Sequence, residues 1–362
     1  MLADGTVEAF RLQAQFCPSY GSPLYADLLT RAAADIDAGG PVAALLDGWQ
    51  GRPTPDALPL RLMGGVHRLV LDGGAPSLAE HYPSAGGTPR GDATWDAFRA
   101  VVATRADVLR PALDRQVQTN EVRRSAALLS GFLTVAARTA LPLRIREIGS
   151  SAGLNLLWDR YRYALPACAA ETPPADDAPL AHTWGDPGAA VTIRSGWHGS
   201  GEVFTGQATV ASRAGCDIAP IDVTDPEQAR TLESFIWADQ VSRLTQLRAA
   251  IAAARREPPP LVRRAAADWL DEELATAPDG VATVVFHSIM WWYLSEPERD
   301  RATALLHAAG ARATPHAPLA WLRFDLFGSP TAEVRLILWP GGEETTLATA
   351  DAHGRWVTWR GR

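Results

Sequence analysis

Residues 143–161 read LRIREIGSSAGLNLLWDRY. They join a strand-like segment to a helix-like one through a turn that has a glycine at each end. Residues 143–148 alternate apolar and polar side chains, which predicts a β-strand, and residues 154–163 have the spacing of a helix. A strand, a glycine turn and a helix in this order are typical of an α/β sheet, whose ligands bind at the carboxyl ends of the strands. We therefore expect residues 149–153 to lie at a binding site.

Strand-like and helix-like segments continue to alternate after this turn. We expect strands at residues 218–223, 261–267 and 281–286, and helices at residues 226–255, 270–276 and 297–309. This alternation predicts βαβ units and a mainly parallel sheet. The end of the chain differs, because residues 319–327, 333–339 and 355–360 are strand-like with only turn residues between them. They predict an antiparallel hairpin at the edge of the sheet.

The chain divides into two parts by the period of its apolar residues. Before residue 141 they recur at intervals of three and four, which predicts a helical lobe over residues 1–140. Residues 141–362 predict a Rossmann-like domain, with residues 164–215, rich in proline, glycine and tryptophan, as an insertion. The expected fold class is therefore α/β, with an N-terminal helical lobe and a C-terminal antiparallel hairpin.

Composition excludes several classes of function. The chain has 362 residues, and its 34 basic side chains against 41 acidic ones give a net charge of −7. Every basic residue is an arginine, so Schiff-base enzymes and the phosphate-binding loops that need a lysine are excluded. The negative charge disfavours nucleic acid as a partner. Oligomeric state is not predicted.

Other residue types indicate the cellular compartment of the protein and whether it binds a membrane or a metal ion. Cys17, Cys168 and Cys216 are far apart, as expected of reduced thiols in a cytoplasmic protein. No apolar run approaches the roughly 18 residues of a membrane span, so no membrane partner is expected. The eight histidines are scattered, with no metal-ligand spacing, so no metal site is expected.

Three interpretations of the glycine turn remain open. Glu147, Gly149 and Gly153 form E-x-G-x-x-x-G, which resembles the opening loop of class I S-adenosylmethionine-dependent methyltransferases, although Ser151 stands where that family has its middle glycine. Gly149, Ser151 and Gly153 also form G-x-S-x-G, the nucleophile turn of α/β-hydrolases. That fold has several strands before its nucleophile, whereas residues 1–140 are helix-like, so the methyltransferase resemblance is favoured. The third interpretation is a turn that only packs a helix on a strand.

The methyltransferase resemblance implies a cofactor, S-adenosylmethionine, and residues that hold it. The implied cofactor-binding residues are Glu147, Gly149, Ser151, Gly153, Asn155, Asp222 and Asp268. Asp222 would end the second strand and bind the ribose hydroxyls, and Asp268 would follow the third strand near the adenine. Asp222 lies 222 − 153 = 69 residues beyond the turn, which requires the 164–215 insertion. Asp222 can instead belong to a turn, and Asp268 can cap a helix.

The expected fourth strand carries the candidate catalytic group. The resemblance places substrate-facing groups at its end, which makes His287 the candidate general base. Trp291, and Asn120 from the segment before the last N-terminal helix, are candidates for the substrate pocket. Each also has an ordinary structural interpretation: a hydrogen-bonded histidine, a core aromatic and a helix cap.

Four segments together resemble a bacterial family catalogued as domain of unknown function 2332. They are QTNEV at 118–122, GSSAGLNL at 149–156, GCDIAPID at 215–222 and VFHS at 285–288. This resemblance implies no activity. The function expected from the sequence is S-adenosylmethionine binding, with methyl transfer to an unidentified small molecule. The alternatives are a non-catalytic nucleotide- or metabolite-binding protein on the same fold and a Ser151 hydrolase.

Overall fold

A computed structural model describes residues 2–175, 177–329 and 331–361. The chain forms two compact units, which are described separately. The helical unit consists of Met1–Thr119 and Asp225–Arg248, and the sheet unit of Asn120–Thr224 and Ala249–Arg362. Helix α8 (Arg124–Thr139) thus groups with the sheet unit, because it packs on the strands, and residues 225–248 group with the helical unit.

The helical unit is built from short helices, many of which have a proline in their first turn. Its helices are α1 (Thr6–Phe16), α2 (Pro23–Asp37), α3 (Pro41–Leu46), α4 (Leu58–Leu71), α5 (Pro76–Ala79), α6 (Asp92–Thr104), α7 (Ala106–Leu113) and α9 (Pro226–Ser234). Proline occupies the first turn of α2, α3, α4, α5 and α9, where its fixed φ suits the helix and its missing N–H costs nothing. Helix α10 (Val241–Arg256) runs from residues of the helical unit into those of the sheet unit.

The sheet unit contains a nine-stranded sheet in the order β5-β12-β11-β10-β9-β8-β1-β6-β7. Its strands are β1 (Leu143–Ile148), β5 (Gly196–His198), β6 (Val210–Asp217), β7 (Leu261–Arg263), β8 (Ala282–Ser288), β9 (Leu319–Asp325), β10 (Ala332–Trp339), β11 (Glu343–Ala350) and β12 (Trp356–Trp359). The segment β7-β6-β1-β8-β9 is parallel, and β9 to β12 are joined antiparallel. The predicted α/β class with a mostly parallel central sheet is therefore confirmed.

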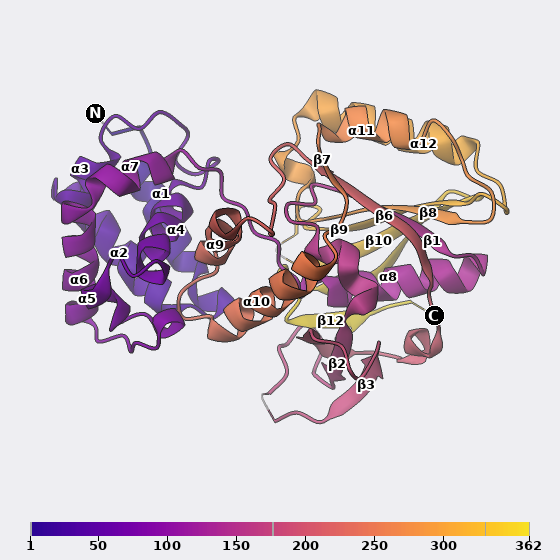
Figure 1. Cartoon of the computed structure of the whole chain (residues 1–362), viewed down its shortest axis with the longest axis horizontal. Helices are drawn as coiled ribbons and strands as arrows, with labels where there is room; N and C mark the ends of the chain where they lie inside the picture. Colours follow the sequence, from indigo (N-terminus) through magenta and orange to yellow (C-terminus); the bar gives the residue numbers. More distant parts are fainter. Residues whose placement is uncertain (1, 176, 330, 362) are drawn as a thin grey trace. The chain divides into compact units, whose positions relative to one another are not determined.

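Helices cover both faces of this sheet. Figure 1 shows α8 along one face, and α11 (Ala266–Glu273) and α12 (Glu296–Ala311) along the other. On the α8 face, the ring of Phe132 meets that of Phe286 edge-on at 5.1 Å. Gly131 lets α8 approach β9 closely, since a Cβ there would lie 2.3 Å from Leu322. Adjacent strand residues point to opposite faces, so the register decides which side chains can meet.

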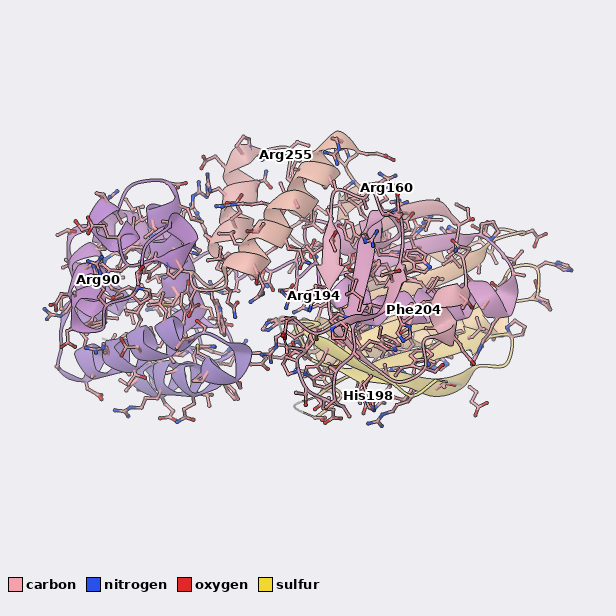
Figure 2. The ribbon with its side chains drawn as sticks, turned by 90° about the horizontal axis from the view of Figure 1, so that it is seen from below. Arg90, Arg160, Arg194, His198, Phe204 and Arg255 are labelled. Carbon is pink, nitrogen blue, oxygen red and sulfur yellow. The ribbon has the colours of Figure 1, made fainter. Side chains whose placement is uncertain are left out.

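The insertion contributes to two sheets. Strands β2 (Arg162–Pro166), β3 (Leu180–Trp184) and β4 (Thr192–Arg194) form a small sheet, while β5 pairs with β12 at the edge of the large one. Figure 2 labels Arg194, His198 and Phe204 in this part of the chain. The rings of Phe204 and Trp197 lie 4.6 Å apart, which joins the segment after β5 to the strand itself.

Several expected elements differ from those observed. Residues 154–163 form a 3₁₀ helix, η3 (Leu154–Arg160), followed by β2 rather than one longer helix. The expected strand at 218–223 is wrong, because the second parallel strand is β6 and ends at Asp217. Asp217 accepts a hydrogen bond from the Ala219 amide at 2.9 Å, and Pro220 lacks an amide hydrogen, so the chain turns there. Strand β11 was not predicted.

Within the part of the chain that the structure describes, no helix combines the length and the apolar character needed to cross a bilayer.

Candidate functional site

The order of the five parallel strands reverses between β1 and β8: strands before this point are added on one side of β1, and later strands on the other side. Numbered by their order in the chain, they lie as 3-2-1-4-5, the order of doubly wound nucleotide-binding sheets. From β1 the chain proceeds outward to β6 and β7, and then returns to place β8 on the other side of β1. In open α/β sheets the ligand crevice lies at such a reversal, beside the carboxyl ends of the two strands. The glycine turn directly follows β1 at this place.

The glycine turn is held by strand β6. Gly149 and Gly153 both have φ of +67°, a conformation that favours glycine. The Ser151 amide donates a hydrogen bond to Oδ2 of Asp217 at 2.8 Å, and the Ser150 amide donates to the Cys216 carbonyl at 3.0 Å. The turn is therefore fixed on β6 as well as on β1.

Positive φ values recur where three adjacent parallel strands end. Ser151 follows β1 with φ of +50°, Ile289 follows β8 with +50°, and Phe327 follows β9 with +39°. Such angles cost about 1–3 kcal/mol for residues other than glycine, most of all for a β-branched side chain such as isoleucine. Strained residues of this kind gather at binding and catalytic sites. The strain marks the carboxyl edge of β1, β8 and β9 as the candidate site.

Glu147 is the buried acid beneath the turn. Glu147 is the penultimate residue of β1 and is 1% exposed. Its Oε2 has no hydrogen-bond partner among the described residues. Burial raises the pKa of Glu147 well above its usual range, the Asp217 carboxylate adds to the rise, and Arg124 opposes it. Arg124 is itself held by the carbonyls of Ala352 at 3.0 Å and Ser288 at 3.3 Å. Glu147 is thus neutral over a wider pH range than an ordinary glutamate.

The raised pKa of Glu147 makes stability depend on pH. Between the unfolded-state pKa of about 4.3 and the higher folded-state pKa, unfolding releases a proton, so the free energy of unfolding falls as pH rises. Glu147→Gln removes this component, because glutamine does not ionise. We expect the variant to gain stability relative to the wild type from pH 4 to pH 8, as measured by urea unfolding at pH 4, 6 and 8. A difference that is constant over this range would contradict the assignment.

The segment before α8 reaches the glycine turn, as the sequence suggested for Asn120. Oδ1 of Asn120 accepts a hydrogen bond from the Leu154 amide at 2.8 Å. Asn155 donates from Nδ2 to the Glu121 carbonyl at 3.4 Å, and its Oδ1 has no partner among the described residues. Asn120 therefore caps the first turn of η3, and Asn155 is the residue with a polar atom left for a ligand.

His287 is buried at the end of β8 on the other face of the sheet. Glu147 pairs with Phe286 across the strands, so His287, one residue on, points away from the α8 side. Its Nδ1 lies 3.5 Å from Oδ2 of Asp325, and neither ring nitrogen has a hydrogen-bond partner among the described residues. Burial lowers the pKa of His287, while Asp325 opposes the shift. The lowered pKa favours the neutral imidazole, in which one ring nitrogen can accept a proton.

Asp325 was not predicted as a site residue, although it lies within the strand expected at residues 319–327, which the structure ends at Asp325. Its Oδ2 accepts hydrogen bonds from the amides of Met290 at 3.3 Å and Trp291 at 3.1 Å. The ring of Trp291 stacks on that of His287 at 4.9 Å and 17°. Asp325 thus organises the segment after β8, and Trp291 covers the histidine. The sequence did contain one signal for Asp325: it is an acidic residue near the end of the strand that follows the His287 strand.

Two of the predicted cofactor residues do not end strands, although Ile221, beside Asp222, donates its amide to the Ser151 carbonyl of the glycine turn at 3.1 Å. Asp222 is exposed and accepts hydrogen bonds from the amide of Thr224 at 2.8 Å and from its hydroxyl at 2.6 Å. Because β6 ends earlier, the acid at its carboxyl end is Asp217. Asp268 lies in the first turn of α11, since β7 stops at Arg263, and its half-exposed side chain pairs with Arg301. The placement of Asp222 and Asp268 at strand ends was wrong.

The residues present fit an adenosyl cofactor in part. The two glycines supply the turn, and Glu147 and Asn155 supply unpartnered oxygen atoms. A Cβ at Gly149 would lie 2.8 Å from the Met290 side chain, so the backbone there is covered by a flexible thioether. Among the described residues, no group of three or more histidine, cysteine, aspartate or glutamate side chains is placed to hold a metal ion.

The chain belongs to the family described as "Uncharacterized protein conserved in bacteria (DUF2332)", which it matches over residues 7–359. The resemblance seen in the four sequence segments is thereby confirmed. No curated protein matches the chain.

Proposed function

We propose that this member of the DUF2332 family binds S-adenosylmethionine at the carboxyl ends of β1 and β8 and transfers a methyl group to a small molecule. The observation that carries the proposal is the 3-2-1-4-5 order of the parallel strands, with the glycine turn directly after the first of them. Doubly wound nucleotide-binding sheets have this order, and the Rossmann-like methyltransferase fold expected from the sequence is of that kind. The strained residues at the same edge of the sheet support the position of the site.

The proposed cofactor residues are Glu147, Gly149, Ser151, Gly153 and Asn155. The positive φ of both glycines exposes backbone on a tight turn, and the free Oε2 of Glu147 accepts a hydrogen bond from an ammonium group. A bound cation also stabilises the charged form of this carboxyl, which burial disfavours. The Met290 side chain moves aside from Gly149 in the bound state.

His287 is the proposed base. When bound, S-adenosylmethionine supplies a methyl group on a sulfonium sulfur, and transfer requires mainly close, in-line approach of the acceptor. A neutral His287 accepts a proton from an acceptor that must lose one, and the Asp325 carboxylate, 3.5 Å from Nδ1, stabilises the imidazolium that forms. Trp291, stacked on the imidazole, excludes water from it and turns aside to admit the acceptor.

Two other functions use the same turn. A non-catalytic adenosyl-binding protein would bind the ligand and consume no methyl groups with any acceptor. A Ser151 hydrolase would be labelled by a fluorophosphonate probe, and Ser151→Ala would abolish the labelling. Neither ring nitrogen of His287 is hydrogen-bonded to the Ser151 hydroxyl, which disfavours the hydrolase.

Thermal unfolding with S-adenosylhomocysteine tests the proposal. Ligand at 100 times its dissociation constant stabilises the folded state by about 2.7 kcal/mol, which raises the unfolding temperature by several degrees. We expect this shift in the wild type, its loss in Glu147→Gln and its retention in Asp186→Asn, since Asp186 is an exposed residue of the insertion that accepts a hydrogen bond from the Gly188 amide. No shift in the wild type, or equal shifts in all three proteins, would refute the proposed site.

A further inference from the structure

One face of helix α4 in the helical unit lines a cavity of about 180 Å³. The residues of α4 at this face are spaced by three and four, as one side of a helix requires, and they are Arg61, Gly64, Gly65, Arg68 and Leu69. Asp72 follows at the same spacing. Helix α7 contributes Val108 and Ala112, and Arg115 lies two residues beyond its end. Helix α9 contributes Thr231 and Ser234, and Phe235 directly follows it.

Two successive glycines make the hollow. Glycine inside a helix costs about 1 kcal/mol relative to alanine, so a pair of them is unfavourable for the helix alone. A Cβ at Gly64 would lie 2.7 Å from the Phe235 ring, and one at Gly65 would lie 3.0 Å from the Ala112 Cβ. The glycines thus let an aromatic ring and a small side chain form apolar walls close to the helix backbone. Leu69 and the partly exposed Val108 extend these walls.

The charged groups at the cavity are mainly positive. The lining contains Arg61, Arg68 and Arg115 against Asp72, which gives 3 − 1 = +2. Arg68 is balanced by Asp72 and by Glu227, whose Oε2 lies 2.5 Å from its Nη2. Arg230 lies 3.4 Å from Asp72, but its own charge is balanced by Glu233, whose Oε2 lies 2.8 Å from its Nη1.

Arg61 and Arg115 carry the excess positive charge. Arg61 donates to two backbone carbonyls, of Asp56 at 2.6 Å and Leu113 at 3.0 Å, which hold its position without neutralising it. Arg115 is exposed and has no side-chain hydrogen bond or ion pair among the described residues. A guanidinium in this state is suited to a carboxylate, which it can bind through two parallel hydrogen bonds.

We propose that this cavity binds a small organic monoanion, a carboxylate joined to a compact apolar group such as a phenyl ring. The apolar walls take the ring, and Arg61 and Arg115 take the carboxylate. The volume suits this class, because roughly 150 Å³ holds benzene in an apolar cavity. The site is separate from the proposed S-adenosylmethionine site and does not depend on it.

Isothermal titration of the full chain with benzoate tests the site, with benzyl alcohol as the neutral analogue and inorganic phosphate as an anion without a ring. We expect benzoate to bind with a stoichiometry of one and at least about tenfold more tightly than either comparison compound. Arg115→Gln should weaken benzoate at least about tenfold, and Ala112→Leu, which fills the hollow, should abolish binding. Arg90→Gln, at an exposed arginine of the same unit (Figure 2), should leave it unchanged.

Arg115→Gln keeps the test independent of folding, because this exposed side chain has no partner to lose within the described part of the chain. Equal affinity of wild type and Arg115→Gln for benzoate would overturn the proposal. Binding of phosphate or benzyl alcohol as tight as that of benzoate would also overturn it, because either result would show that the site does not require both a carboxylate and a ring.

Discussion

Asp217→Ala is expected to destabilise the sheet unit by about 3 kcal/mol and to abolish binding of S-adenosylhomocysteine. Asp217 accepts hydrogen bonds from the amides of Ser151 at 2.8 Å and Ala219 at 2.9 Å. Hydrogen bonds to a charged group contribute about 1.5–3 kcal/mol each, and the variant leaves the amide of Ser151, a buried residue, without its acceptor. Because Ser151 has a strained φ, loss of this anchor also releases the turn from its binding conformation.

Asp186→Ala is the matched control. It removes an exposed acid of the insertion, whose side chain accepts a hydrogen bond from the Gly188 amide at 2.8 Å. We expect a loss below about 1 kcal/mol and unchanged ligand binding. Urea unfolding and calorimetric titration of both variants measure the two effects. Equal losses in the two variants would mean that Asp217 has no special role in holding the turn.

Trp158→Ala is expected to cost about 3–5 kcal/mol, the range for truncating a large buried aromatic side chain. Trp158 is fully buried in η3, and its ring stacks on Phe132 of α8 at 4.4 Å and on Trp184 of β3 at 5.5 Å. Trp158 of η3 thus packs against both helix α8 and the small sheet of the insertion. Its removal leaves a cavity that three elements would have to close together.

Trp292→Ala is the control for this truncation, since Trp292 is 59% exposed. It contacts Tyr293, with ring centroids 4.4 Å apart, and should cost less than about 1 kcal/mol. Urea unfolding followed by circular dichroism suits both variants, because tryptophan fluorescence changes with the substitutions themselves. A cost for Trp158→Ala no larger than that for Trp292→Ala would contradict the packing described.

The sequence predicted best the elements whose signals are local. The alternation in residues 143–148 and the two glycines after it identified β1 and its turn, because strand period and glycine spacing do not depend on distant residues. The second parallel strand was misplaced because residues 218–223 are as apolar as a strand. Their conformation is set instead by the Asp217 side chain, which turns the chain through the Ala219 amide. Side-chain control of this kind has no periodic signal.

The candidate site was predicted unevenly for the same reason. Glu147 and His287 lie at the ends of adjacent parallel strands, which sequence order and strand pattern could indicate. Asp222 was preferred to Asp217 because the strand was placed too late in the sequence. The contact of Asp325 with the segment after β8 depends on the pairing of β9 beside β8, and so did not emerge from the sequence.

Hydrogen exchange with and without saturating S-adenosylhomocysteine locates the ligand on the chain and so tests the proposed adenosyl site. We predict slower amide exchange in residues 148–155, after β1, and in residues 288–294, after β8. Unchanged exchange in both segments, or protection confined to the helical unit, would contradict an adenosyl site at the reversal of the parallel sheet.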